Sequence, residues 1–299
     1  MEKRILGKTN LAVSVLGLGG AEIGFAPGIT AGQVREILAE AIDAGLNIID
    51  SAAAYLKSES LLGEALGELR KRVYLATKCG AIEGFARSDW SKAGILRSIE
   101  QSLKNFRTDY LDIVLLHSCG ALEFMWGEAA EGLIAAREKG YVRFIGYSGD
   151  GSSALSAIQA NCFDVLETSI NIADQEALTL TLPLARQKNL GVIAKRPVAN
   201  AAWRTGKLPE NEYHHEYYRR LTELDYPFLK QPLSEAVAVA LGFTLAQPGV
   251  QTAIVGTTRP GRWKENAALL EKRALSAPEC EAIRRRWMGL ADPTWVGQI

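Results

Sequence analysis

The chain has 299 residues, 47% of them hydrophobic, and its 34 Lys and Arg side chains balance its 34 Asp and Glu side chains, so the formal net charge is zero. This balance argues against a nucleic-acid-binding or membrane-surface protein, because both classes carry an excess of positive charge. The longest apolar stretch, Ala236–Leu245, is far shorter than the roughly 20 residues that cross a bilayer, so we expect no membrane partner.

The cysteines point to a reducing compartment. There are four, Cys79, Cys119, Cys162 and Cys280, and they show no CxxC spacing. In a chain of this length such cysteines are typical of reduced cytosolic thiols. The first residues also lack the apolar region of a signal peptide. We therefore expect a cytoplasmic protein.

Apolar, strand-like runs recur along the chain, and helical patterns separate them. They are Val15–Gly19, Asn47–Asp50, Val73–Lys78, Leu111–His117, Phe144–Ser148, Val165–Ser169, Gly191–Lys195 and Thr252–Val255. Near-continuous apolar strands separated by helices are typical of a parallel sheet buried on both faces. Eight such units fit a closed (β/α)8 barrel better than an open doubly wound sheet. The sequence therefore predicts one α/β TIM-barrel domain over residues 1–299.

Other segments predict how the barrel is framed. Arg4–Val15 has turn-forming residues at its centre and predicts a short N-terminal hairpin. The clearest helix begins at a capping box, Thr30–Gln33, and ends near Gly45. A second capping box, Ser276–Glu279, predicts the start of a C-terminal helix.

The connection after the seventh run is unusually long. The stretch between Ala199 and Gln231 is polar and rich in Tyr and His. Loops of this length are usually functional, so we predict a mobile lid. His214 and His215 could in principle bind a metal, but adjacent side chains in a polar loop rarely chelate one ion, and we expect no metal site.

Four residues suited to proton transfer stand at or just after the ends of three consecutive runs. Asp50, Lys78 and His117 close the second, third and fourth runs, and Tyr55 lies in the loop after the second. In such barrels catalytic groups come from the carboxyl ends of several strands, so these side chains should converge at one mouth. An ammonium lowers the pKa of a nearby phenol, a carboxylate can hold that ammonium, and a neutral imidazole can orient a carbonyl. Any one of them could simply end an apolar run, but together they predict proton transfer at a carbonyl or alcohol.

The segment Asp50–Glu59 resembles the signature of the aldo-keto reductase family, in which four residues separate Asp from Tyr and Ser-Glu follows. Lys78 in Ala-Thr-Lys and His117 in Leu-Leu-His match the two remaining catalytic positions of that family. The likeness covers essentially the whole chain, including residues 4–9, 140–148 and 247–266.

This resemblance implies NADPH-dependent reduction of aldehydes or ketones to alcohols, with the cofactor extended across the barrel mouth and no Rossmann domain. Tyr55 would be the general acid, Lys78, paired with Asp50, would lower its pKa, and His117 would orient the carbonyl. NADH is also possible. The alternatives are an NAD-dependent alcohol or sugar dehydrogenase and a cofactor-sensing regulatory subunit. The expected partner is a small carbonyl molecule, and the expected state is a monomer or weak homo-oligomer.

The resemblance also implies positions that contact the nicotinamide. Ser148 would contact its carboxamide. Gly20 closes a glycine-rich turn that lacks the GxGxxG spacing and would approach the cofactor. Glu167 stands where the family usually has Gln, and Lys195, followed by Arg196, stands where an aromatic ring usually stacks. These departures, with Ala21 and Ser118-Cys119 in place of Trp and Trp-Pro, leave substrate choice open.

The 2′-phosphate end of the cofactor would lie at residues 256–266, where the family usually has Lys-Ser first and Arg six residues after the Lys. The residues implied here are Thr257, Thr258, Arg259, Arg262, Glu265 and Asn266, the last two as the adenine-contacting pair. Gly256 replaces the usual Lys, so one phosphate contact is lost. Arg262, Arg259 and Thr257 are expected to outweigh that loss, and we predict a preference for NADPH over NADH.

Overall fold

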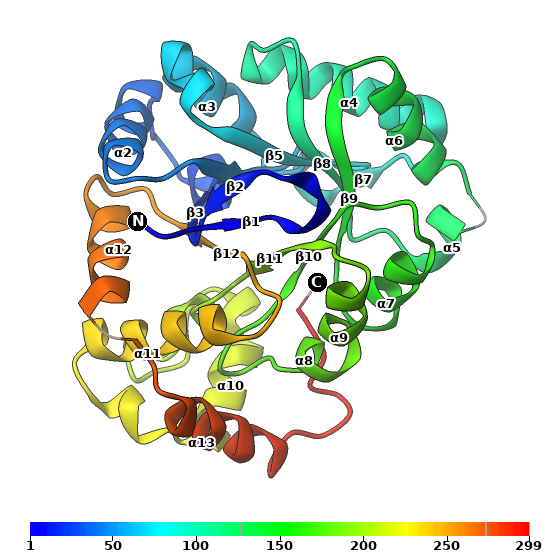
Figure 1. Ribbon diagram of the computed structural model, residues 1–299. Coiled ribbons are helices and arrows are strands. Elements are labelled where there is room, and N and C mark those ends of the chain that lie inside the picture. Colours follow the sequence, from blue (N-terminus) through cyan, green and yellow to red (C-terminus); the bar gives the residue numbers. More distant parts are fainter. Residues whose placement is uncertain (126, 273, 299) are drawn as a thin grey trace.

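The computed structural model describes residues 1–125, 127–272 and 274–298, and its centre is a closed barrel of parallel strands (Figure 1). Around the barrel the strands follow chain order from β3 through β4, β5, β8, β9, β10 and β11 to β12, which pairs with β3. They span Leu16–Gly19, Ile48–Asp50, Tyr74–Cys79, Leu111–His117, Val142–Ser148, Val165–Ser169, Gly191–Lys195 and Thr252–Gly256. Each strand coincides with one predicted apolar run to within two residues at either end, so the predicted (β/α)8 barrel is confirmed.

Helices alternate with the strands and form the outer layer (Figure 1). They are α1 Ala21–Phe25, α2 Ala31–Asp43, α3 Ser58–Leu66, α4 Lys92–Phe106, α5 Ala121–Met125, α6 Ala129–Glu138, α7 Gly151–Gln159, α8 Ala177–Leu180, α9 Leu182–Gln187, α10 His215–Leu224, α11 Leu233–Ala246, α12 Arg262–Lys272 and α13 Ala277–Met288. The first predicted capping box begins α2, where the Gln33 amide donates to the Thr30 hydroxyl at 3.3 Å. The second, at Ser276 and Glu279, begins α13.

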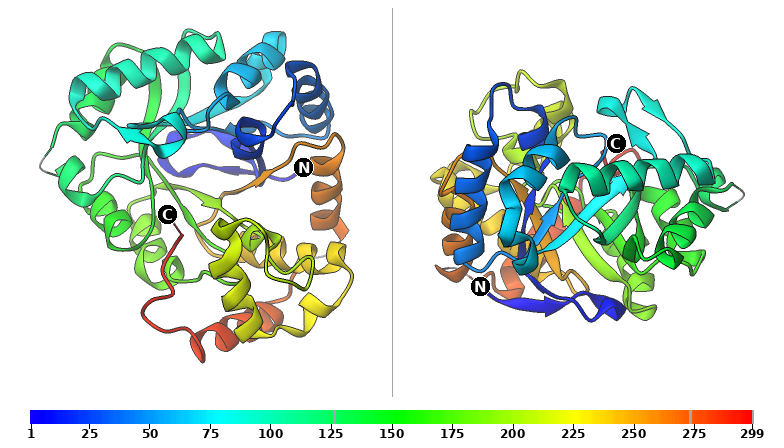
Figure 2. Two further views of the ribbon diagram at one scale, coloured as in Figure 1. Left: turned by 180° about the vertical axis from the view of Figure 1, so that it is seen from behind. Right: turned by 90° about the horizontal axis from the view of Figure 1, so that it is seen from above.

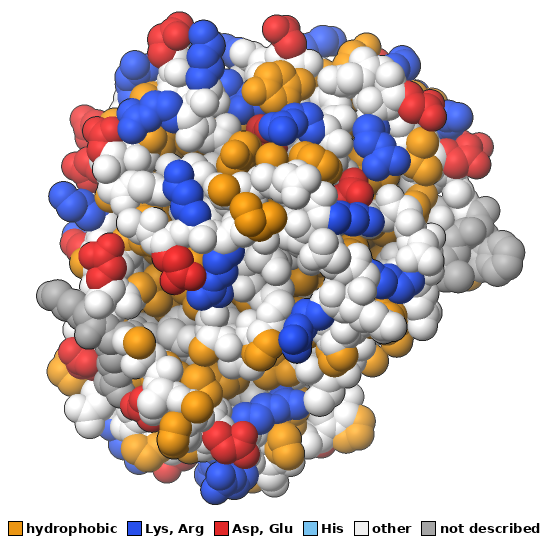
Figure 3. Space-filling view, in the orientation of Figure 1, with side chains coloured by type: hydrophobic (Ala, Val, Ile, Leu, Met, Phe, Trp, Pro, Cys, Tyr) orange, Lys and Arg blue, Asp and Glu red, His pale blue; other side chains and the backbone are white. Residues whose placement is uncertain are grey.

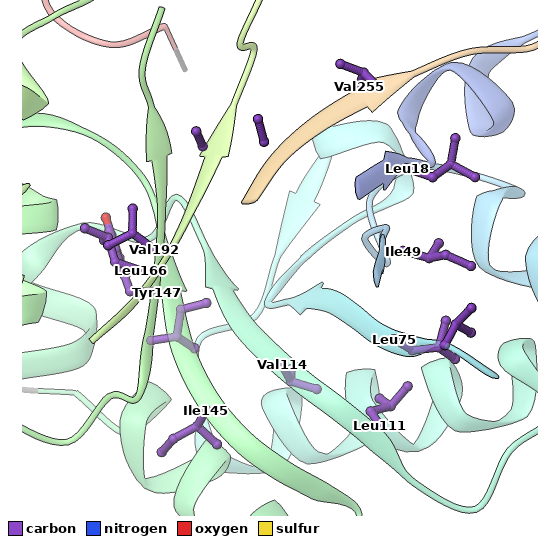
Figure 4. Packing of buried hydrophobic residues seen from close by; sticks show 14 of the residues in the cluster. Leu18, Ile49, Leu75, Leu111, Val114, Ile145, Tyr147, Leu166, Val192 and Val255 are labelled. Carbon is purple, nitrogen blue, oxygen red and sulfur yellow. The ribbon is translucent and has the colours of Figure 1, made fainter. Parts of the chain in front are cut away.

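The barrel wall separates two buried clusters, because successive residues of a strand point to opposite faces. Outward-facing residues such as Ile49, Leu75 and Leu166 pack under the helices (Figure 4). Inward-facing residues fill the barrel itself and are Ile48, Ala76, Ile113, Leu115, Val165, Ile193 and Ile254. The alternation continues past the apolar part of each strand, and it decides which polar residues face the barrel axis.

A short hairpin closes one end of the barrel. Its strands β1 (Lys3–Ile5) and β2 (Ala12–Ser14) pair antiparallel. Leu6, Leu11 and Val13 of this hairpin are buried with the inward-facing strand residues. The right-hand view of Figure 2 shows the hairpin at one end of the molecule and the C-terminal end of the chain at the other. The open mouth therefore lies at the carboxyl ends of the strands.

The long connection after β11 folds into helices along much of its length. It contains short 3-10 turns at Ala199–Ala201, Glu212–His214 and Pro227–Lys230, as well as α10. Tyr217, Leu221 and Leu224 of α10 are buried in a third apolar cluster with residues of α11 and α13. Their spacing is that of one helix face, a pattern hidden in a stretch that otherwise reads as polar.

The surface shows charges of both signs. On the face drawn in Figure 3, Lys and Arg side chains are interspersed with Asp and Glu side chains. Within the described ranges, no helix is long and apolar enough to cross a membrane. The same residues include no group of three or more His, Cys, Asp or Glu side chains that could hold a metal ion. His215 Nε2 instead forms a hydrogen bond with the Pro209 carbonyl at 2.7 Å, and all four cysteines are free thiols.

Candidate active site

The barrel mouth brings together the polar residues at the ends of three strands. Asp50, Lys78 and His117 each lie two residues beyond a side chain of the inner cluster. Because side chains alternate with a period of two, all three face the barrel axis. Adjacent pairing of β4 with β5 and of β5 with β8 then places them side by side, as the sequence predicts.

Asp50 and Lys78 form a buried ion pair. Lys78 Nζ donates to Asp50 Oδ2 at 2.6 Å and to the Ser51 carbonyl oxygen at 3.0 Å, and the Lys78 side chain is only 1% exposed. Burial opposes the ammonium, but Asp50 and Glu167 raise the pKa of Lys78 above its ordinary value. Burial and the Glu167 carboxylate raise the pKa of Asp50 well above its ordinary value, and Lys78 acts against that rise.

The Tyr55 ring lies against this pair. Lys78 Nζ is 5.3 Å from the centre of the ring. Burial raises the pKa of the Tyr55 phenol above its ordinary value, and the Lys78 ammonium opposes the rise. The ammonium thus acts in the direction expected from the sequence, but burial outweighs it. The phenol therefore keeps its proton at neutral pH, which is the form that an acid catalyst needs.

His117 is the neighbour of Tyr55. The two ring centroids are 5.5 Å apart, with the planes at 81°. Burial lowers the pKa of His117 well below its ordinary value, and Lys78, Lys195 and Arg196 act in the same direction, so the imidazole is neutral. His117 Nδ1 has no hydrogen-bond partner among the residues that the structure describes. A neutral imidazole with an unpaired ring nitrogen is suited to a polar ligand atom.

The backbone turns sharply just after these strand ends. Leu56, Ser118 and Arg196 each directly follow a candidate site residue, and their φ angles are +45°, +58° and +55°. A left-handed backbone at a residue other than glycine costs on the order of 1–3 kcal/mol. These turns directly follow Tyr55, His117 and Lys195.

Glu167 brings a second carboxylate to the Lys78 ammonium. It lies on β10, in register with Ser148 on β9, and its side chain is buried. Glu167 Oε1 is 3.3 Å from Lys78 Nζ and accepts a hydrogen bond from Ser148 Oγ at 3.3 Å. The two residues that the resemblance assigns to the nicotinamide are thus part of the network around Lys78.

Lys195 and Arg196 share a carboxylate that no sequence pattern identified. Lys195 Nζ is 3.0 Å and Arg196 Nη1 is 3.7 Å from Asp150 Oδ2. Burial opposes ionisation of Asp150, but these two cations hold its pKa below the ordinary value. Arg196 also donates to Ser169 Oγ at 2.7 Å and to the Tyr213 hydroxyl at 2.5 Å. The second contact joins the long connection after β11 to the mouth.

Three apolar side chains near Tyr55 were also not identified from the sequence. Phe25 is on α1, and Phe85 lies between the short strands β6 (Ala81–Ile82) and β7 (Arg87–Ser88). Their ring centroids are 6.1 Å and 6.2 Å from that of Tyr55, and Phe85 lies 4.9 Å from His117. With Leu56, all three side chains are about half-exposed. Large exposed apolar groups gathered beside polar ones are typical of a ligand-binding surface.

The segment after β12 holds the residues implied for the 2′-phosphate. Arg259 and Arg262 both form ion pairs with Glu265, and the Arg262–Glu265 distance is 3.4 Å. Both guanidinium groups are about half-exposed at the start of α12. Planar donors at a helix N-terminus suit a phosphate. The other residues implied at this end are Thr257, which is buried, Thr258, which is exposed, and Asn266, which follows Glu265 on α12.

Two glycines of the mouth permit close contacts. A Cβ at Gly20 would lie 2.5 Å from Ser58 Oγ, and the Gly20 amide donates to the Asp50 carbonyl at 2.7 Å. At Gly256 a Cβ would lie 1.6 Å from a carboxylate oxygen of Glu22. The Glu22 carboxylate therefore lies against Gly256, and a larger side chain at this position would require the Glu22 side chain to move.

Comparisons with known proteins point to one family. The model of the Aldo/keto reductase family matches residues 15–287. L-galactose dehydrogenase of Arabidopsis thaliana is 28% identical, over 100% of this chain and 99% of that protein. NADH-specific methylglyoxal reductase of Escherichia coli strain K12 is 27% identical, over 90% of this chain and 94% of that protein. The holo form of the aldo-keto reductase AKR11C1 from Bacillus halodurans superposes with a TM-score of 0.82 and 25% identity over 99% of each chain.

Proposed function

Because the chain belongs to the aldo/keto reductase family, we propose that it reduces aldehydes or ketones to alcohols with NADPH, and that Tyr55 donates the proton. One observation supports this most strongly: the buried Lys78 ammonium faces the protonated phenol of Tyr55, with the neutral His117 alongside. The pair of Lys78 with Asp50 gives that ammonium a fixed position.

In the proposed proton transfer, the four residues of the predicted catalytic set each have one role. A carbonyl that accepts a hydride becomes an alkoxide, and the Tyr55 hydroxyl supplies its proton as that negative charge develops. Lys78 stabilises the phenolate left behind, because an opposite charge favours the ionised form. Asp50 holds Lys78 in place, and His117 offers a ring N–H to the carbonyl oxygen.

The residues present fit a nicotinamide dinucleotide, which supplies the hydride when bound. Asp50 Oδ1, His117 Nδ1 and Glu167 Oε2 are buried at the mouth and have no hydrogen-bond partner within the described part of the chain, as expected where a polar ligand is to be received. At the other end, Arg259 and Arg262 can each give a phosphate charge-assisted hydrogen bonds, worth about 1.5–3 kcal/mol each.

NADH is the second candidate cofactor, because two carboxylates lie close to the proposed phosphate position. Glu265 pairs with both arginines, and the Glu22 carboxylate lies against Gly256. In dinucleotide sites an acidic side chain typically accepts a hydrogen bond from a ribose 2′-hydroxyl. The Escherichia coli relative is named as NADH-specific.

Binding titrations of two variants separate these cofactors. Arg262→Ala is expected to weaken NADPH binding by about tenfold or more, because one charge-assisted contact is worth at least that factor, and to leave NADH binding nearly unchanged. Glu22→Gln removes a carboxylate from the same region and should strengthen NADPH binding. Equal losses for both cofactors in Arg262→Ala would show that Arg262 is structural.

The same groups can also run in the oxidising direction. Similarity to a plant protein named L-galactose dehydrogenase supports an NAD-dependent alcohol or sugar dehydrogenase as the alternative activity. A cofactor-sensing regulatory subunit would bind cofactor without turnover. These functions are separated by measuring cofactor oxidation with a panel of aldehydes and ketones, and cofactor reduction with alcohols and sugars. Tight cofactor binding without turnover on either panel would contradict the proposed reductase.

A further inference from the structure

We propose that Glu167 is a positioning residue of this site: by sharing the Lys78 ammonium with Asp50, its carboxylate sets the pH range in which Tyr55 donates a proton. The inference rests on the proposed carbonyl reduction and goes beyond it, because it concerns the direction that the site favours at neutral pH. Glu167 Oε2 is left to meet a ligand, and the inference gives Glu167 a further, electrostatic role within the protein through Oε1.

Three oxygen atoms lie close to Lys78 Nζ. An ammonium has three N–H groups. Lys78 Nζ is 2.6 Å from Asp50 Oδ2, 3.0 Å from the Ser51 carbonyl oxygen and 3.3 Å from Glu167 Oε1. The first two contacts are hydrogen bonds and the third is an ion pair. Among the described residues no hydrogen bond joins Lys78 Nζ to the Tyr55 hydroxyl, and the centre of the Tyr55 ring is 5.3 Å from Nζ. Lys78 therefore acts on Tyr55 through space, and anything that changes the charge beside Lys78 changes its effect on the phenol.

Lys78, Asp50 and Glu167 form a buried group whose net charge acts on Tyr55. Asp50 and Glu167 surround one ammonium with two carboxylates, and each of the three side chains is no more than 5% exposed. When both carboxylates are ionised, this trio has one net negative charge, which disfavours the phenolate of Tyr55. Asp50 and Glu167 both act to raise the pKa of Tyr55, against the action of Lys78.

Other titratable groups face the same space. From the remaining strands and helices they are His117, which is neutral, the cluster of Asp150, Lys195 and Arg196, the hydrogen-bonded pair of Asp174 and Tyr217, and buried Glu59 of α3, which accepts a hydrogen bond from Thr77 Oγ1 and interacts with Lys78. Among these cations Arg196 acts on Tyr55 more weakly than any member of the trio. Lys78, Asp50 and Glu167 therefore have the largest electrostatic effects on the Tyr55 phenol among these groups. Of the three, only Glu167 is not in the predicted catalytic set.

The sign of the effect follows from the protonation state that each direction needs. Reduction requires the phenol and is lost as the pH rises through the pKa of Tyr55. Alcohol oxidation requires the phenolate and appears as the pH rises through the same pKa. Because its negative charge raises that pKa, Glu167 extends reduction to higher pH and holds back oxidation near neutral pH.

The test is the pH profile of Glu167→Gln, which keeps the size of the side chain and removes its charge. The alkaline limb of reduction and the rising limb of alcohol oxidation should both move to lower pH by about one unit, a tenfold change in proton affinity. Glu167→Asp keeps the charge and should restore most of the wild-type profile. Asp112→Asn removes a buried carboxylate that is paired with Arg70 and Arg143, away from Lys78, and should shift neither limb.

The ionisation of Tyr55 can also be measured without turnover. Absorbance titration of each protein, with the titration of its matched Tyr55→Phe variant subtracted, reports the phenolate. A folded Glu167→Gln protein whose limbs and phenolate titration match those of the wild type would overturn the inference. So would lower activity with an unshifted profile, because that outcome describes a structural role alone. If the wild-type protein turns over no carbonyl, the proposed function fails, while the titration still decides the role of Glu167.

Discussion

At Tyr55 the removal of one oxygen atom separates proton donation from the packing of the ring. Tyr55→Phe keeps the ring contacts with Phe25, Phe85 and His117. We expect kcat for reduction to fall by roughly 10²–10⁴-fold, the usual contribution of a positioned acid, while the Kd for the cofactor stays the same. Steady-state kinetics and cofactor titration check this. Near-normal turnover in the variant would show that another group supplies the proton.

Lys78 should contribute through its charge. Lys78→Met keeps most of the side chain but leaves the carboxylates of Asp50 and Glu167 buried without their cation, so it should cripple reduction and alter the pH profile of any residual activity. Losing one partner of a buried pair also typically costs about 3–5 kcal/mol, so thermal unfolding must be measured alongside.

Asp50→Asn provides the matched comparison at the same ion pair. It should be milder than Lys78→Met, because Lys78 keeps Glu167 as a counter-ion. Greater damage from Asp50→Asn than from Lys78→Met, or a normal kcat and pH profile in Lys78→Met, would remove Lys78 from the mechanism.

At the scale of elements, the connection after β11 divides into two parts that should behave differently. Most of residues 203–214 are exposed, and Tyr213 joins this part to Arg196 at the mouth. The following helix, α10, is held by its buried face. We expect hydrogen exchange in residues 203–214 to slow when NADP⁺ binds, with α10 unchanged as the internal control. Equal exchange with and without the cofactor would describe a passive surface segment.

The elements also show which parts of the site a sequence can reveal. Asp50, Lys78 and His117 were predictable because strand periodicity fixes the direction of a side chain once the strand is found. Asp150 and Phe85 were not, because their positions depend on loop conformations that no periodic pattern records. In α10 the spacing of Tyr217 and Leu221 does follow a helix, but buried Arg220 between them conceals the apolar face.

For the whole molecule, Asp174 should make stability depend on pH. Tyr217 donates to its Oδ2 at 2.9 Å, and burial together with Asp150 raises the pKa of Asp174 to about 7. In the unfolded chain an aspartate has a pKa of about 4. The folded state therefore binds the proton more tightly, so this contribution to stability is fully present below about pH 4 and is lost as the pH rises through about 7.

Thermal unfolding of Asp174→Asn measures that contribution, because an amide cannot titrate but can still accept from Tyr217. Between about pH 8 and pH 5.5, the melting temperature of the wild type should rise relative to that of the variant, following the protonation of Asp174. A constant difference between the two proteins across this range would show that Asp174 does not titrate there.

The charges gathered at the mouth also have a consequence for how this site can evolve. They are Asp50, Lys78, Asp150, Glu167, Lys195 and Arg196, three of each sign. By the resemblance described above, Glu167 and Lys195 stand at two positions where the family pattern has uncharged residues, and their charges cancel. A lineage that acquired only one of them would leave this buried set with one excess charge, which is unfavourable in a buried site. Related sequences are therefore expected to carry both charges or neither, so the two positions should covary although the side chains do not form an ion pair with each other.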